Sequence, residues 1–238
     1  MIDRPTAADS GCVVPQGLTD IELGATAGRL SGPPGGRFDN LPDLAVRWGL
    51  PADWELVWLP PNAQRESLDA RAGGPAKTIR GFGPITIGTK HVLGYGEHWQ
   101  WTAEVLATLP SGDSRFGSRG LGSAVNAIAG YGDGRLGVSL MAGFTSETEP
   151  TAAGGRRFQS FNPDLVVTWA SSSRLQLFAE IYSQSHSGYL QGWGANADGG
   201  VQYLVTPHLV VDVEEGVGIA GSLGGFANYM GAGLGLMF

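Results

Sequence analysis

The segment Ser185-His186-Ser187 carries residue types that could perform nucleophilic catalysis. A histidine beside a serine can take the hydroxyl proton while the serine attacks a lipid ester, and a carboxylate such as Glu180 could orient that histidine. Adjacent residues of a strand or loop seldom point together, however, and no oxyanion-hole signature accompanies this segment. We therefore expect no catalytic residues. A barrel enzyme or lipid-binding barrel that uses residues 185–187 is kept as an alternative.

Other ligand-binding chemistry has weaker support in the sequence. The four histidines are scattered between opposite ends of the predicted barrel and there is a single cysteine, Cys12, so we expect neither a metal site nor a disulfide. The formal net charge of −7, with no basic stripe, argues against nucleic acid as a partner. No cofactor is predicted.

Charged residues instead recur at every second position of extended segments, which places them on one face. The predicted lumen-lining set is Glu22, Arg47, Glu55, Lys90, Glu104, Arg135, Asp164, Arg174, Glu180, Asp198, Asp212 and Glu214. A cationic side chain facing lipid near the bilayer midplane costs about 2 to 4 kcal/mol, so this segregation is what a membrane barrel requires. Acids outnumber bases, which fits either a mildly cation-favouring lumen or salt bridges that fill a narrow barrel.

The elements that would position these charges are strands with a side-chain period of two. Residues 174–183 show it best, with Leu175, Leu177, Ala179 and Ile181 opposite polar neighbours. Similar segments are expected at residues 19–30, 43–50, 54–59, 83–92, 98–109, 123–131, 135–144, 161–169, 194–205, 209–217 and 226–238. About twelve strands result, an even number, as in bacterial barrels.

The connections between these segments alternate in length. Long ones at residues 31–40, 60–81, 110–120, 145–157 and 184–192 alternate with short ones such as residues 51–53 and 132–134. Short periplasmic turns and longer outer loops are typical of an outer-membrane barrel. The predicted fold is therefore all-β, an antiparallel up-and-down transmembrane β-barrel of about twelve strands, with a soluble ligand-binding β-protein as the alternative.

Aromatic residues gather at the two ends of the predicted strands. The periplasmic set is Trp48, Trp54, Trp99, Trp101, Tyr131, Trp169, Tyr203 and Phe238, and the outer set is Trp58, Phe144, Phe161 and Phe226. Two such girdles are expected where rings lie at lipid headgroups. Phe238 ends an alternating strand, and its position resembles the C-terminal aromatic that the barrel-assembly machinery recognises, so it is a candidate assembly signal.

Composition agrees with a strand-rich fold. The 39 glycines disfavour helices, and there is no apolar run of about 18 residues that would form a spanning helix. Residues 1–17 form a polar segment that could fold into the lumen as a plug or remain a loose tail, and residues 18–238 form the predicted barrel. The amino terminus has no signal-peptide pattern, although the expected location, the outer membrane of a Gram-negative bacterium, requires export.

Several stretches resemble an outer-membrane barrel family associated with meta-pathway phenol degradation. They are residues 2–6, Val14-Pro15-Gln16-Gly17, Ile21-Glu22-Leu23-Gly24, residues 81–90, Leu109-Pro110-Ser111-Gly112, residues 161–165, 174–178, 198–207 and 231–238. Ile2 stands where the family more often has threonine. The resemblance covers nearly the whole chain and implies a transporter without established catalytic residues.

From these observations we expect an outer-membrane channel for passive or facilitated uptake of small solutes, including hydrophobic or aromatic ones. Its expected partners are outer-membrane lipid, the barrel-assembly machinery and the solute, and the sequence leaves the oligomeric state open. Whether the pore is open or plugged is likewise left to the structure.

Overall fold

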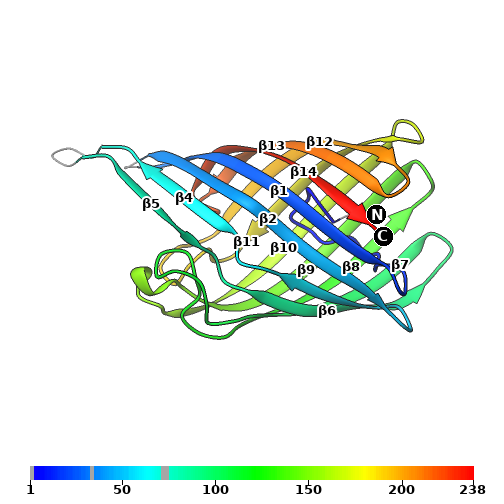
Figure 1. The fold of residues 1–238 in the computed structure, drawn as a ribbon, viewed down its shortest axis with the longest axis horizontal. Coiled ribbons are helices and arrows are strands. Elements are labelled where there is room, and N and C mark those ends of the chain that lie inside the picture. The colour runs from blue at the N-terminus through cyan, green and yellow to red at the C-terminus, as the bar shows by residue number, and fades with distance from the viewer. Residues whose placement is uncertain (1–2, 33–34, 71–74) are drawn as a thin grey trace.

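The computed structural model describes residues 3–32, 35–70 and 75–238, and these residues form one antiparallel sheet that closes into a barrel (Figure 1). Its strands are β1 (Thr19–Leu30), β2 (Gly36–Leu50), β3 (Trp54–Leu59), β4 (Ala63–Leu68), β5 (Lys77–Phe82), β6 (Thr86–Tyr95), β7 (Trp99–Thr108), β8 (Gly122–Gly132), β9 (Leu136–Thr148), β10 (Arg157–Ala170), β11 (Leu175–Gln184), β12 (Gly194–Thr206), β13 (Leu209–Gly221) and β14 (Phe226–Met237). The pairing of β1 with both β14 and β2 closes the ring.

The wall has twelve strand positions, because two of them are each occupied by two short strands in succession. β3 pairs with the C-terminal part of β2, residues 46–50. β4 follows β3 in the chain and pairs with the N-terminal part of β2, residues 36–40. On the next position β6 pairs with β3, and β5 pairs with β4. Prolines cannot donate to a ladder, and Pro60, Pro61 and Pro84 stand at these interruptions. The predicted twelve-strand barrel is confirmed.

Two connections that were predicted as long loops contain strands, namely the N-terminal part of β2 and the β4–β5 hairpin. Residues 60–81 are not simply a long loop, since they contain this hairpin, which projects beyond the rest of the rim in Figure 1. Residues 31–40 are shorter as a loop than expected, because β2 already begins at Gly36. The pairing of β1 with β2 shifts register between Gly24 and Thr26 of β1. This irregularity interrupts the alternation along β2, so the sequence pattern did not predict the N-terminal part of that strand.

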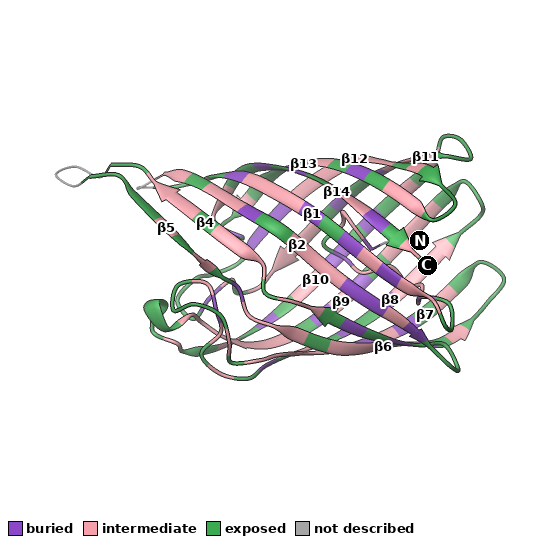
Figure 2. Cartoon of the chain, in the orientation of Figure 1, coloured by how far each residue is buried: buried purple, intermediate pink, exposed green. Residues whose placement is uncertain are grey.

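Apolar side chains cover the outside of the barrel. Leu140, Phe144 and Ile181 are among the most exposed, at 53%, 64% and 53%, while the alternating positions of the same strands are buried (Figure 2). A soluble protein would bury such a continuous apolar band, so the soluble alternative fails. This surface is the one that a transmembrane barrel presents to lipid.

Most aromatic residues lie in the predicted girdles. Trp99 stacks with Trp101 at a centroid distance of 6.4 Å near the short turns, and Phe144 lies 4.9 Å from Phe161 near the long loops. Two assignments were wrong. Trp58 stacks on Trp48 in the periplasmic girdle, because β3 ends at Leu59 and pairs with the periplasmic half of β2.

Phe226 is the second aromatic assigned to the wrong environment. The centroid of its ring lies 5.5 Å from that of the Phe38 ring and 5.8 Å from that of the Tyr229 ring. The hydroxyl of Tyr229 donates to Asp198, so this aromatic cluster lies on the inner side of the wall. A register shift beside Leu30 separates Phe226 from the regular alternation of β14, which is why counting every second residue failed there.

A single turn of 3-10 helix, Thr151–Ala153, lies in the β9–β10 loop. No helix in the described part of the chain is long and apolar enough to cross a membrane.

Candidate functional site in the barrel lumen

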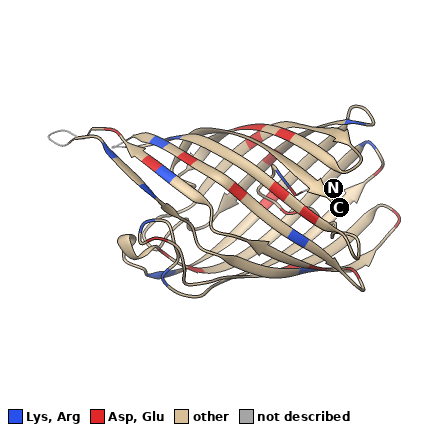
Figure 3. Ribbon diagram, viewed as in Figure 1, with Lys and Arg blue, Asp and Glu red and all other residues tan. Residues whose placement is uncertain are grey.

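The inner face of the barrel gathers most of the charged residues that period two predicts. Glu22, Arg47, Glu55, Lys90, Glu104, Asp164, Glu180 and Asp212 are buried, and Asp198 and Glu214 are half-buried on the same face. They come from strands all round the wall, so their side chains converge on the lumen. Apart from Arg47 and Lys90, all of these residues are acidic. Figure 3 marks acidic and basic positions along the strands in red and blue.

Arg135 and Arg174 were wrongly placed in this set. Each lies in a short turn, Arg135 before β9 and Arg174 before β11, and both are exposed. Alternation holds only while the chain is extended, and the predicted strands began one residue too early. These two arginines therefore lie at the periplasmic rim rather than in the lumen.

The N-terminal segment, residues 3–18, enters the barrel, and its residues 3–14 contact the inner wall, whereas Pro15, Gln16 and Gly17 are exposed. Its backbone amides donate to strand carboxylates: Asp3 N to Glu22 at 2.6 Å, Ala8 N to Glu180 at 2.9 Å and Val14 N to Glu55 at 2.7 Å. These three acceptors lie on β1, β11 and β3. The segment is therefore held from several sides of the wall.

Ion pairs anchor Asp3 at the centre of these contacts. Its Oδ2 lies 3.0 Å from Nζ of Lys90 and 3.2 Å from Nε of Arg47. Arg47 also contacts Glu22 at 2.7 Å and Asp9 at 3.3 Å. Burial opposes ionisation of Asp3, but the two cations together hold the pKa of its carboxyl well below its usual range. Removing one partner of such a buried network leaves an uncompensated charge.

Arg4 forms a second anchor, which joins the segment to β13 and to β2. Its guanidinium lies 3.4 Å from Asp212 and 3.5 Å from Asp43. A Cβ built at Gly24 or Gly233 would collide with that guanidinium, so a larger residue at either position would displace Arg4 from this place. The small inner face of β1 and β14 thus accommodates the N-terminal segment.

The middle of the segment is fixed by hydrogen bonds to β7. The carbonyl oxygen of Gly11 accepts from the hydroxyl of Thr102 and from the amide of Gln100. Cys12 follows directly, and burial raises the pKa of its thiol. The thiol is thus held beside the inner wall in its protonated form.

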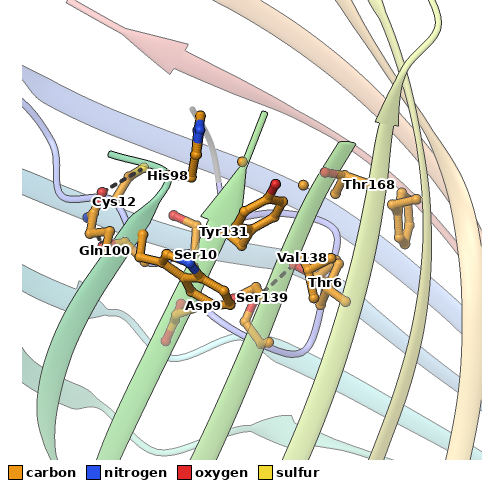
Figure 4. Close-up of a pocket in the computed structure, with 18 of the residues that line it drawn as sticks. Thr6, Asp9, Ser10, Cys12, His98, Gln100, Tyr131, Val138, Ser139 and Thr168 are labelled. Carbon is orange, nitrogen blue, oxygen red and sulfur yellow. Dashed lines mark hydrogen bonds between the residues drawn. The ribbon is translucent and has the colours of Figure 1, made fainter. Parts of the chain in front are cut away.

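Two cavities lie on either side of this segment, and Thr6 and Asp9 line both. The first, of about 390 Å³, reaches the turns between β6 and β7 and between β8 and β9 at the periplasmic end. Figure 4 shows Cys12, Ser10 and Asp9 facing Gln100, Tyr131 and Ser139 around it, with Val138 and Thr168 farther along the wall. The second, of about 350 Å³, reaches Pro60 and Pro84 at the strand interruptions on the way to the outer end. The segment therefore divides the lumen.

The Ser185-His186-Ser187 loop does not assemble with Glu180. Nδ1 of His186 lies 3.4 Å from the Ser185 hydroxyl, but that hydroxyl accepts from the Phe161 amide at 2.9 Å, and Ser187 donates to the carbonyl of Ser222. The Glu180 oxygens accept from Ala7 and Ala8 in the lumen. The carboxylate proposed to orient the histidine is thus engaged elsewhere.

Metal ligation has no geometric basis in the part of the chain that the structure covers. Among those residues no group of three or more His, Cys, Asp or Glu side chains is arranged to hold a metal ion.

The closed barrel with an apolar exterior and a polar interior defines an outer-membrane β-barrel protein of a Gram-negative bacterium. The chain matches the family described as "Putative MetA-pathway of phenol degradation" over residues 2–222, and it belongs to that family. No match was found among curated protein sequences.

Solved structures with a similar fold are outer-membrane barrels. The NanC porin has a TM-score of 0.59 at 14% identity, covering 92% of this chain and 98% of that one. The KdgM porin has a TM-score of 0.58 at 9% identity, covering 92% and 99%. The translocator domain of the autotransporter NalP from Neisseria meningitidis has a TM-score of 0.55 at 12% identity, covering 94% and 88%. At such identities the likeness concerns the fold.

Proposed function

We propose that the barrel is a channel for passive or facilitated uptake of small solutes, with residues 3–18 acting as a plug that sets how far the lumen is open. The two cavities that meet at Thr6 and Asp9 are the observation that carries this proposal. A barrel of twelve strands has a bore between the filled eight-stranded and the open sixteen-stranded barrels, so a short segment is enough to obstruct it.

The periplasmic cavity favours solutes with an apolar ring. Phe178, Val166 and Val138 supply apolar surface, while Gln100, Gln176 and Thr168 supply hydrogen-bonding groups. A mainly apolar pocket with a few polar groups is the usual receptor for a small, weakly polar molecule. A volume near 390 Å³ accommodates a monocyclic aromatic compound. The family description, which names phenol degradation, is in keeping with such a solute.

We propose that this passage involves no catalysis, because the carboxylate that the serine and histidine loop would need is hydrogen-bonded to the plug. Ester hydrolysis by the refolded barrel, lost in Ser185→Ala or Ser187→Ala, would support the enzyme instead. Assembly by the barrel-assembly machinery and association with outer-membrane lipid are further parts of the proposal.

Cys12 offers a direct test of solute entry, because it lines the periplasmic cavity and is the chain's single cysteine. In refolded protein, phenol should slow maleimide labelling of Cys12, whereas glycerol at the same concentration should not. Equal labelling rates with and without phenol would contradict binding in this cavity. A Cys12→Ser variant that still carries label would show that the signal does not come from Cys12.

A further inference from the structure

Four arginines form a row on the outside of the barrel near its outer rim. They are Arg29, Arg37, Arg65 and Arg80, on the neighbouring strands β1, β2, β4 and β5, and all are exposed. Arg29 pairs with Arg37, Asp39 with Arg65, and Arg65 with Arg80 across the sheet. Directly paired residues have Cβ atoms about 5 Å apart and lie on the same face. The four arginines therefore lie on one face of neighbouring strands, and this set is termed here the arginine row.

The arginine row faces away from the lumen. Arg29 continues the alternation of Leu23, Ala25 and Ala27, the outward residues of β1. Glu66, beside Arg65, takes the opposite face, where its carboxylate pairs with Arg115 of the β7–β8 loop at 3.1 Å. Asp39 pairs with Arg37 at 2.7 Å and is the acidic residue of the row, so positive charge remains in excess. Figure 3 shows the blue positions on the hairpin and the adjoining strand ends.

The height of the arginine row matches the outer headgroup layer. Arg37 is eleven residues from Trp48, the girdle residue at the periplasmic end of β2. At about 3.3 Å per residue and a tilt of about 40°, this separation is about 28 Å along the barrel axis. The apolar band of such a barrel is about 25 Å tall. Two exposed apolar residues mark the outer edge of this band. Leu41 is two residues from Asp39 on β2, and Phe82 is two residues from Arg80 on β5.

Like charges on paired strands repel, so an anion bound beside the row would stabilise it. Guanidinium groups match phosphate oxygens by paired hydrogen bonds, and an anionic headgroup at the same height would supply them. We infer that the arginine row binds the phosphorylated headgroup of an outer-leaflet lipid. This site is independent of whether the lumen conducts, since it lies on the opposite face of the wall.

The test uses the refolded full chain in detergent micelles with a bisphosphorylated diglucosamine lipid, and native mass spectrometry to count retained lipid. The variant is Arg65→Gln/Arg80→Gln. Its control is Arg135→Gln/Arg174→Gln, which makes the same change of charge in the periplasmic turns. Each basic residue near an anionic surface contributes about fivefold, so the first pair should weaken binding on the order of 20-fold, and the control should not.

Two results would overturn the inference. One is equal loss in both double variants, which would show only a general effect of net charge. The other is equal retention of the same lipid without its phosphates, which would show that phosphate is not the ligand. Heat-modifiable migration of each folded barrel on a gel verifies that the variants have folded.

Discussion

Nζ of Lys90 lies 3.0 Å from Oδ2 of Asp3, which joins a strand of the barrel wall to the segment inside it. Both side chains are buried, and neither is within reach of the lipid face. A cation in the wall thus has its partner in the N-terminal segment. The ion pair makes the position of that segment part of the barrel's own stability.

Replacing one partner of this ion pair should destabilise the folded barrel. Lys90→Met should destabilise the folded barrel by about 3 kcal/mol, because Asp3 would remain buried with a weaker set of partners. Urea titration of refolded protein in lipid vesicles measures this loss. Lys90→Met combined with Asp3→Asn should recover part of it, and a double variant as unstable as the sum of both single variants would contradict the coupling.

Gly24 should control the seating of the N-terminal segment. Gly24→Val puts a side chain where the Arg4 guanidinium lies, and overpacking of this kind costs about 1 to 3 kcal/mol. The population with the segment released should rise by about 5-fold to 150-fold, seen as faster maleimide labelling of Cys12. Ala25→Val, which faces outward on the same strand, is the control. Equal acceleration in both variants would argue against contact with Arg4.

The two faces of β9 should respond oppositely to charge. Leu140→Arg introduces a cation on the lipid face in the middle of the strand and should cost about 2 to 4 kcal/mol in bilayer folding. Ser139→Arg, one residue earlier, points into the periplasmic cavity and should fold nearly normally. Folding yields in vesicles decide the matter, and similar yields for both would show that the assigned faces are wrong.

Phe238 remains a candidate assembly signal. Its exposed ring lies outside the barrel, and its backbone pairs with Thr19 where the ring closes. Phe238→Ala should reduce assembly by purified barrel-assembly machinery, while Phe226→Ala, which removes a ring from the inner face of the same strand, should not. Equal reduction in both variants would show a general effect of lost apolar surface.

Alternation predicted the strands best where lipid lies on one side. β1 and β3 begin and end where the sequence places them, since hydrocarbon outside and polar groups inside force a period of two. The same rule fails where the wall extends beyond the hydrocarbon layer. β4 and β5 carry Arg65 and Arg80 outward and Glu66 inward, so neither face is apolar and no period appears.

The contents of the lumen depended on tertiary contacts that no local pattern contains. The sequence placed Glu22, Glu55 and Glu180 on the inner face, but not their hydrogen bonds to Asp3, Val14 and Ala8. Those bonds join residues far apart in the chain. The charges of Asp3 and Arg4 were the available signal, because residues of opposite charge, Lys90 and Asp212, were predicted on the inner face.

Single-channel recording in planar bilayers tests the central claim most directly. The wild-type barrel should show small or intermittent conductance, and Asp3→Asn, which removes the charge held by Lys90 and Arg47, should raise it. A variant with residues 3–14 replaced by glycine and serine should conduct most. Absence of conductance and of phenol flux in all three proteins, each verified as folded, would contradict a channel obstructed by its own N-terminal segment.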